Sequence, residues 1–223
     1  MAGLTGSARS APLLVVPVGS VEQHGPHLPL GTDTRIAVAL ADALAEARPP
    51  AVVGPAVAYG ASGEHARFAG TLSIGSEALA TLLTELVRSA DAFAGVVLVN
   101  GHGGNAAALA TVTDVAAREG RRVLHWSPRV SGGDAHAGRT ETSLLLAVDP
   151  AAVHLDRAEP GNPRPLAELA SALRRGGLDA VSPNGILGDP TGASAAEGRT
   201  LLDALAADLV AAVDRWRERP VAG

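Results

Sequence analysis

Short apolar runs alternate with longer segments of helical periodicity along most of the chain. The runs are rich in β-branched residues and predict strands at 13–18, 51–57, 95–99 and 122–126. The longer segments place an apolar residue every three or four positions and predict helices at 34–47, 77–90, 106–119, 141–149, 166–175 and 195–217. This alternation predicts an α/β fold, in which helices cover both faces of a mostly parallel sheet.

The loops between these elements contain one long segment of unclear period, the glycine-rich residues 59–74. Long loops in compact domains are often functional. Ser76, just after this loop, is predicted to cap the helix at 77–90. No internal repeat or linker divides the chain, so we expect a single domain over residues 1–223, with a disordered tail at 1–11.

Composition narrows the kinds of core and partner. The chain is 47% hydrophobic but only 2% aromatic, so its core is expected to consist of Ala, Val and Leu. A formal net charge of -5 argues against nucleic acid or an anionic membrane as the main partner. The N-terminal residues lack the apolar core of a signal peptide, and no apolar run is long enough to span a membrane. We therefore expect a cytoplasmic protein.

The absence of cysteine restricts the chemistry. It removes disulfides, thiolate metal ligands and a cysteine nucleophile together. Any bound metal must therefore be held by nitrogen and oxygen atoms. A set of Glu, Asp and His ligands without thiolate suits Zn, Fe or Mn, and the sequence does not choose among them.

Three polar clusters directly follow predicted strands, at 20–33, 100–105 and 127–141. In open α/β sheets, ligands bind beyond the carboxyl ends of the strands. The three clusters are distant in sequence, yet a parallel sheet would bring them to one edge. The sequence therefore predicts a single functional site built from all three.

The first cluster, read GSVEQHGPHLPLGTD, contains Glu22, His24 and Asp33. Glu22 and His24 are two positions apart, so in an extended segment their side chains point to the same side. Two carboxylates and an imidazole at a strand end favour a divalent metal site. The alternative is that Asp33 caps a helix while Glu22 and His24 are solvated.

The second and third clusters add further candidates. His102 lies in NGHGGN between two glycines, which let the backbone come close to a ligand. Its alternative is a phosphate-binding turn at a helix N-terminus, although both GxGxxG and the Walker pattern are absent. Glu141 begins an apolar helix, where it could be a ligand or a carboxylate that the helix dipole favours. His136 and Asp134, in the loop before it, are equally open to both readings.

Taken together, EQHGPHLPLGTD, NGHGGN and HAGRTETS, in this order, resemble the creatininase family of metal-dependent amidohydrolases. The resemblance covers nearly the whole chain. It implies a three-layer α/β/α fold and a site for two divalent metal ions. By position, it implies that one ion is held by Glu22, Asp33, His102 and Glu141. The second would be held by His24 and by Asp33, which bridges the two ions.

Two positions depart from relatives of the family. Creatininase proper has a Glu two residues after the equivalent of His102, where this chain has Gly104. The second metal site therefore has one protein ligand fewer than in creatininase. Some relatives also carry a Glu where this chain has Arg139, a difference that bears on the substrate.

Within the family, the chain is most similar to peptidases that cleave a modified, ribosomally made precursor peptide near its C-terminus. The stretches AYGASGEHARFAGTLSIG and RRGGLDAVSPNGILGDPTGASAAEG carry this similarity. It implies release of a small product derived from Val and Tyr, and relatives that form closed homo-oligomers imply a hexamer here. The alternatives are a hydrolase of a small cyclic amide or formamide, a catalytically inactive metal-stabilised binding protein, and a nucleotide-binding α/β protein.

The expected chemistry is metal-assisted hydrolysis of an amide. Two divalent ions can share a water and bring its pKa towards neutrality. We expect Glu22 and His136 to be catalytic, with His136 protonating the leaving amine. A guanidinium is the usual partner of a peptide's terminal carboxylate, so Arg139 or Arg67 could hold the substrate, unless both are solvated surface residues. The other expected substrate contacts are Gly103, Gly104 and His65.

Overall fold

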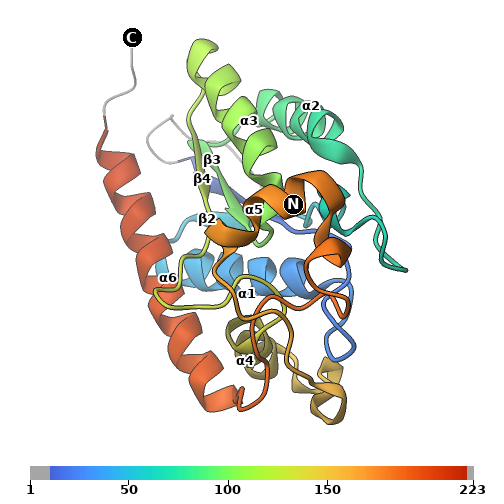
Figure 1. Cartoon of the computed structure of the whole chain (residues 1–223). Helices are drawn as coiled ribbons and strands as arrows, with labels where there is room; N and C mark the ends of the chain where they lie inside the picture. The colour runs from blue at the N-terminus through green and yellow to red at the C-terminus, as the bar shows by residue number, and fades with distance from the viewer. Residues whose placement is uncertain (1–10, 220–223) are drawn as a thin grey trace.

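The structure, a computed structural model, describes residues 11–219 and contains a four-stranded sheet. Its strands are β1 (Leu13–Val18), β2 (Ala51–Val53), β3 (Gly95–Asn100) and β4 (Val123–Trp126). Their order is β2-β1-β3-β4, and every neighbouring pair is parallel (Figure 1). The predicted tail at 1–11 falls almost entirely outside the described residues.

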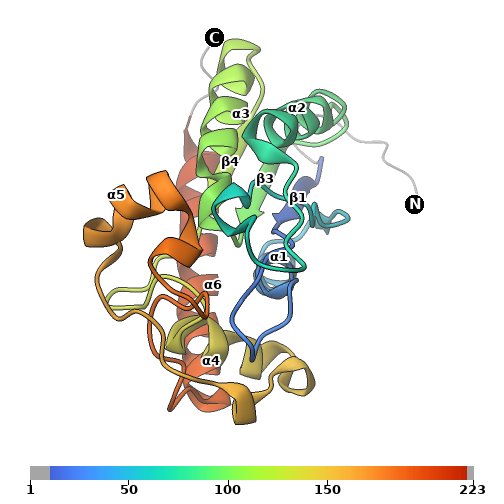
Figure 2. The same ribbon diagram turned by 45° about the vertical axis from the view of Figure 1, so that its right-hand side comes forward.

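Within the described residues, six α-helices accompany the sheet: α1 (Thr32–Ala47), α2 (Gly75–Arg88), α3 (Ala106–Arg118), α4 (Arg139–Val148), α5 (Leu166–Gly176) and α6 (Ala195–Glu218). The helices α2 and α3 cover one face, and α1, α4 and α6 cover the other. Figure 2 shows α5 apart from these layers, at the left side of the view. The predicted three-layer α/β/α fold is confirmed.

Alternation along β1 and β3 explains the layers. Successive side chains of a strand point to opposite faces of the sheet. Val16 and Leu98 therefore pack with α2 and α3, whereas Val15 and Val97 pack with α1 and α6. All four side chains are almost completely buried, and each stabilises the fold by roughly 1.5–3 kcal/mol.

Two local predictions were wrong in detail. The strand expected at 51–57 ends at Val53, and beyond it only Val57 forms an isolated bridge with Val18. Pro55, which lacks an N–H, lies in this interruption, where a strand ladder cannot continue. Ser76 does not cap α2, because the helix begins one residue earlier at Gly75 and its N-cap is Ile74.

The segment 59–74 folds back over the carboxyl ends of β1 and β3. It contains a short 3-10 helix, η1 (Gly63–His65), and Leu72 bridges to Val21. Gly60 approaches so closely that a Cβ there would lie 2.5 Å from the carbonyl oxygen of Gly19. The loop therefore forms one wall of the site edge. No helix in the described part of the chain is both long and apolar enough to cross a membrane.

Candidate metal centre

The five predicted metal ligands converge at the carboxyl edge of the sheet. Glu22 and His24 lie in the turn after β1, and Asp33 lies in the first turn of α1. His102 directly precedes the short 3-10 helix η2 (Gly103–Asn105) after β3, and Glu141 lies in the first turn of α4. The first four are buried, and the side chain of Glu141 is 23% exposed.

Asp33 lies at the centre of this cluster. Its Oδ1 is 3.0 Å from Nε2 of His24, and its Oδ2 is 3.4 Å from Nδ1 of His102. The hydroxyl of Ser20 donates a hydrogen bond of 2.5 Å to Oδ2. One oxygen of Asp33 thus faces each imidazole, which is the arrangement that a bridging carboxylate needs.

Backbone carbonyls fix the imidazole tautomers of both ligands. Nδ1 of His24 donates to the carbonyl oxygen of Glu22 at 3.1 Å. Nε2 of His102 donates to the carbonyl oxygen of Ala61 at 3.2 Å. The remaining nitrogens, Nε2 of His24 and Nδ1 of His102, then direct their lone pairs into the cluster. A hydrogen bond that sets the tautomer of a ligating histidine is usual at metal sites.

The carboxylate of Glu22 provides the test of whether a cation fits. Both of its oxygens are buried and accept no well-formed hydrogen bond from the described residues. Nδ1 of His102 lies 3.1 Å from Oε1 of Glu22, so without a metal this nitrogen has to carry a proton, or its lone pair would oppose that of the carboxylate. Buried charges without a partner are costly, and a divalent cation between these atoms would remove that cost. The donor set therefore fits a metal.

The potential ligands form groups with compatible spacing. Glu22, Asp33 and His102 make one group, and His24, His136 and Glu141 make a second. The structure places the Glu141 carboxylate 3.8 Å from Nε2 of His24, with the second group rather than with Glu22 and His102. Asp33 contacts an imidazole of each group, so the two groups share one carboxylate.

The pKa shifts show which groups of the cluster carry protons when no metal is bound. Burial opposes protonation of His24, but the Asp33 carboxylate outweighs it, and the pKa of His24 is raised to about 10. Against the same burial, Asp33 and Glu22 hold the pKa of His102 well above its usual value. Burial raises the pKa of Glu141 to about 7. Protons therefore compensate the carboxylates, and a metal would displace them on binding.

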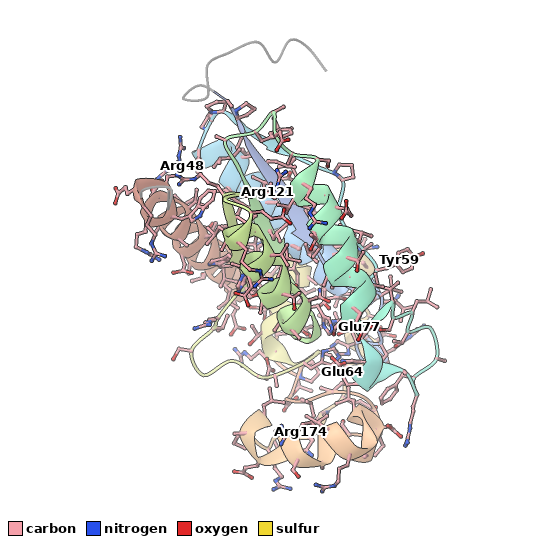
Figure 3. The ribbon with its side chains drawn as sticks, turned by 90° about the horizontal axis from the view of Figure 1, so that it is seen from above. Arg48, Tyr59, Glu64, Glu77, Arg121 and Arg174 are labelled. Carbon is pink, nitrogen blue, oxygen red and sulfur yellow. The ribbon has the colours of Figure 1, made fainter. Side chains whose placement is uncertain are left out.

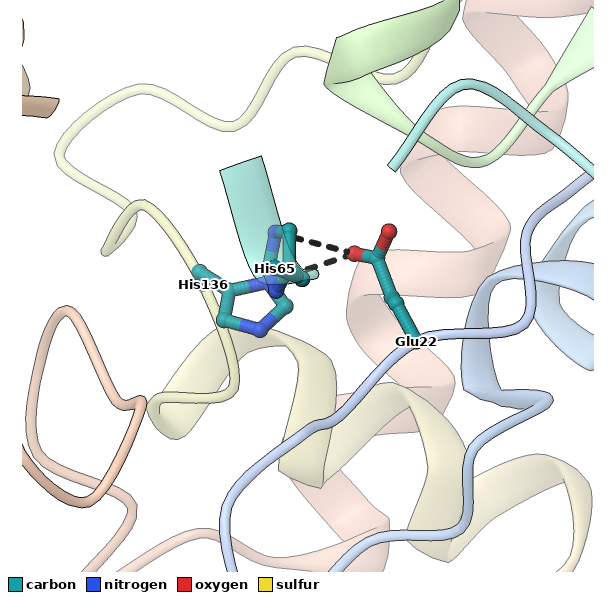
Figure 4. Close-up of side chains that lie close together, drawn as sticks. All are labelled: Glu22, His65 and His136. Carbon is teal, nitrogen blue, oxygen red and sulfur yellow. Dashed lines mark ion pairs between the residues drawn. The ribbon is translucent and has the colours of Figure 1, made fainter. Parts of the chain in front are cut away.

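The imidazoles of His136 and His65 lie beside the buried carboxylate of Glu22 (Figure 4). Nδ1 of His136 is 3.8 Å and Nε2 of His65 is 3.4 Å from Oε1 of Glu22. Burial lowers the pKa of both imidazoles, that of His65 to about 4. Nε2 of His136 donates to the carbonyl oxygen of Gln23 at 3.0 Å, so its unprotonated Nδ1 faces the cluster. A neutral imidazole in this position can accept a proton.

Comparison with known protein families identifies the family of the chain. The model described as creatininase, creatinine amidohydrolase, matches residues 4–213 of the chain. The chain belongs to the creatininase family. Its relative from Mycobacterium tuberculosis (strain H37Rv), named mycofactocin precursor peptide peptidase, is 52% identical over 235 residues. That match covers 98% of this chain and 93% of the relative. The prediction of a hydrolase that acts on C–N bonds is confirmed.

Solved structures of creatininase share the fold. One titled "Creatininase Mn" is 26% identical, covers 96% of this chain and 93% of its own, and has a TM-score of 0.78. A mutant creatininase described as "Zn-Zn type" is 26% identical, covers 96% and 93%, and has a TM-score of 0.77. Both titles name metals that suit the donor set found here.

Sequence reasoning missed Gln23, which connects two histidines of this creatininase-family site. Its Oε1 accepts from the N–H of Gly25 at 2.9 Å, and its Nε2 donates to the carbonyl of Gly185 at 3.0 Å. These bonds orient the amide, whose second N–H points to Nδ1 of His65 at 3.1 Å, while the backbone carbonyl of Gln23 accepts from Nε2 of His136 at 3.0 Å. The only signal in the sequence was its position between two predicted ligands.

The arginines expected to hold substrate point elsewhere. Arg139 pairs with Glu197 of α6 at 2.9 Å, and Arg67 pairs with Asp179 at 3.1 Å. Both arginine side chains are more than half exposed. The structure thus does not bring either arginine to the metal ligands.

The other expected substrate contacts do border the site. His65 lies over Glu22, and Gly103 and Gly104 follow His102. A cavity of about 220 Å³ opens beside His102 and Glu141. It is lined by polar groups at the carboxyl ends of β3 and β4 and by the apolar side chains Ile36, Val130 and Leu144. This space is adjacent to both ligand groups and is where a substrate side chain could lie.

Proposed function

We propose that this chain is a metal-dependent peptidase that cleaves the mycofactocin precursor peptide near its C-terminus and releases the product derived from Val and Tyr. The relative named for this activity supports the substrate. The convergence of Glu22, His24, Asp33, His102 and Glu141 on one sheet edge supports the chemistry and is the observation that carries the proposal. The ions are Zn, Fe or Mn, two per chain.

The residues of the chain divide the work of hydrolysis. Divalent ions held by these residues would supply a bound water of lowered pKa and would polarise the scissile carbonyl. Glu22, Asp33 and Glu141 provide the negative charge, and His24 and His102 provide lone pairs of fixed direction. The bonds to the backbone carbonyls orient both rings before any ligand arrives, so neither ring has to turn during the reaction.

In this proposal His136, although grouped above with His24 and Glu141, does not bind a metal and instead carries the proton. Its neutral Nδ1 faces Glu22 and Glu141 at 3.8 and 3.9 Å. It accepts a proton from the attacking water, whose oxygen bonds to the carbonyl carbon. It then returns that proton to the leaving nitrogen as the C–N bond breaks. The bond from its Nε2 to the Gln23 carbonyl keeps Nδ1 directed at the site throughout.

Assembly is a further part of the proposal. Tyr59, Leu72 and Ile74 belong to the segment 59–74 and are 52%, 54% and 37% exposed. Exposed apolar side chains on one segment are typical of interaction surfaces. We infer a homo-oligomer, with a hexamer as the expected form, in which this segment contacts a neighbouring copy.

The decisive experiment combines metal analysis with peptide cleavage. We expect the purified protein to hold two divalent ions per chain and to lose activity on chelation. Asp33→Ala should lose most of its bound metal and most of its activity, because Asp33 contacts an imidazole of each ligand group. Asp203→Ala, an exposed position of α6, is the matched control and should keep wild-type metal content. Full peptide cleavage by metal-free protein would reject the proposal.

A further inference from the structure

Gly104 is surrounded by atoms of the segment that covers the site. A Cβ at this position would overlap Nε2 of His102 and the carbonyl oxygen of Ala61, and it would lie 2.6 Å from Oε1 of Glu64. The backbone of Gly104 does not adopt a positive φ. A glycine is therefore needed here for space rather than for conformation. That space is occupied by the loop that carries Ala61 and Glu64.

The carboxylate of Glu64 faces two imidazoles of the site. Its Oε1 lies 3.5 Å from Nε2 of His102 and 3.9 Å from Nε2 of His65. Among residues 11–219, no arginine pairs with Glu64. Burial raises the pKa of Glu64, and the charges of Glu22 and Asp33 add to this effect. Figure 3 shows Glu64 at the border between the α/β layers and α5.

The same nitrogen of His102 thus faces two oxygen atoms that can only accept, the Ala61 carbonyl and the Glu64 carboxylate, and the Ser62 hydroxyl also lies 3.5 Å away. Both favour the tautomer protonated at Nε2, which leaves Nδ1 free towards Glu22 and Asp33. A carboxylate beside the outer N–H of a ligating histidine fixes the ring and increases the basicity of the ligating nitrogen. Glu64 is close enough to exert this effect only because residue 104 has no side chain.

We propose that Glu64 is a positioning residue for the metal centre, which orients His102 and strengthens its bond to a metal, and that Gly104 is required to admit it. This inference rests on the proposed metal-dependent function. It assigns a role to a carboxylate that comes from the segment opposite His102 and would not itself bind the ion.

Metal affinity measures this role directly. Zn²⁺ is titrated into metal-free protein in competition with a chromophoric chelator, for wild type, Glu64→Ala and Glu64→Gln. Loss of an outer hydrogen-bond partner typically weakens metal binding by about 10–100-fold. We expect about tenfold or more for Glu64→Ala and an intermediate loss for Glu64→Gln, which keeps an acceptor but no charge. Glu77→Ala, an exposed residue of α2, is the control and should bind as wild type does.

A spectroscopic measurement separates positioning from general loss of structure. The visible spectrum of cobalt-substituted protein reports the ligand field of the bound ion, and it should shift in Glu64→Ala while remaining close to wild type in Glu77→Ala. Gly104→Ala should weaken Zn²⁺ binding as well. Because both changes disrupt the same contact, the double variant should lose less affinity than the two single losses combined.

Two outcomes overturn the inference. One is Zn²⁺ affinity within about twofold of wild type in both Glu64 variants, and the other is an unchanged cobalt spectrum in Glu64→Ala. Glu64→Gln is nearly isosteric, so it tests the role even if Glu64→Ala folds poorly. If wild type binds metal but does not cleave the precursor peptide, the proposed function fails, whereas the affinity comparison still decides the role of Glu64.

Discussion

At the scale of single residues, backbone carbonyl oxygens orient the rings of three buried histidines. Carbonyl oxygens of Glu22, Ala61 and Gln23 accept from His24, His102 and His136, respectively. Each bond selects one tautomer and leaves the second nitrogen for chemistry. The residue types were predictable from the motifs, but the nitrogen that each ring presents depends on these bonds.

His27 gives a prediction about acid stability. It is fully buried, its Nε2 lies 2.9 Å from the Thr142 hydroxyl, and burial lowers its pKa to about 4. The unfolded chain, with a pKa near 6.5, therefore takes up this proton first as the pH falls. The stability that neutral His27 contributes is present above pH 6.5 and is lost between pH 6.5 and 4.

We expect metal-free His27→Gln to lose less stability than metal-free wild type between pH 7 and 5, by roughly 1–2 kcal/mol. Urea unfolding at the two pH values measures the difference. His154→Gln, at an exposed position, is the control and should follow wild type. Equal acid sensitivity of His27→Gln and wild type would contradict the assignment.

At the scale of elements, α4 carries Glu141 and is tied to the start of α6. The N–H of Ser194 donates to the hydroxyl of Ser143 at 3.1 Å, and that hydroxyl donates to Glu197 at 3.1 Å. Gly198 allows the two helices to touch, since a Cβ there would overlap the carbonyl oxygen of Ser143. The position of Glu141 thus depends on contacts between α4 and the start of α6, which lies more than fifty residues further along the chain.

Gly198→Ala tests that crossing. In an exposed helix, this change would stabilise the protein by about 1 kcal/mol. Here we expect a loss of roughly 1–3 kcal/mol, because the new methyl group forces α6 away from α4. Thermal or urea unfolding gives the sign. Gly63→Ala, an exposed position where a Cβ would meet nothing within 4 Å, should change stability by less than about 0.5 kcal/mol. A stabilised Gly198→Ala would rule out the close crossing.

At the scale of the whole molecule, the segment 59–74 joins the site to the outer surface. Its inner side carries His65 over Glu22, and its outer side exposes Tyr59 and Leu72. Figure 3 shows Tyr59 at the right-hand edge of the view. An oligomer contact on this segment would therefore also hold the wall of the site in place.

We expect light scattering at micromolar concentration to give the mass of a homo-oligomer, with the hexamer as the expected form. Tyr59→Ser with Leu72→Ser should lower that mass, because the substitutions remove exposed apolar area from the proposed contact. Leu166→Ser changes a similarly exposed side chain of α5 and should leave the mass unchanged. A wild-type mass equal to that of one chain would refute the assembly.

The sequence by itself determined the order of strands and helices, the parallel sheet with helices on both faces, and the three polar clusters that meet at its edge. These features follow from local periodicity and from polar residues placed directly after apolar runs. Element ends were less predictable: β2 stops before Pro55, and α2 begins at Gly75 rather than after Ser76. The residue types in the motifs and the resemblance to a family also led to the hydrolase.

Only the tertiary structure decided which ligands share a group and which ring nitrogens face the metal cluster. It also placed Gln23 and Glu64 beside histidines of the site. Gln23 donates to Gly185, 162 residues away in the chain, and His102 meets Ala61 and Glu64 of a separate loop. Such contacts depend on how distant segments fold against each other, which no local pattern encodes. The same reason separates Arg139 from the ligands: its pairing with Glu197 is set by the packing of α4 against α6.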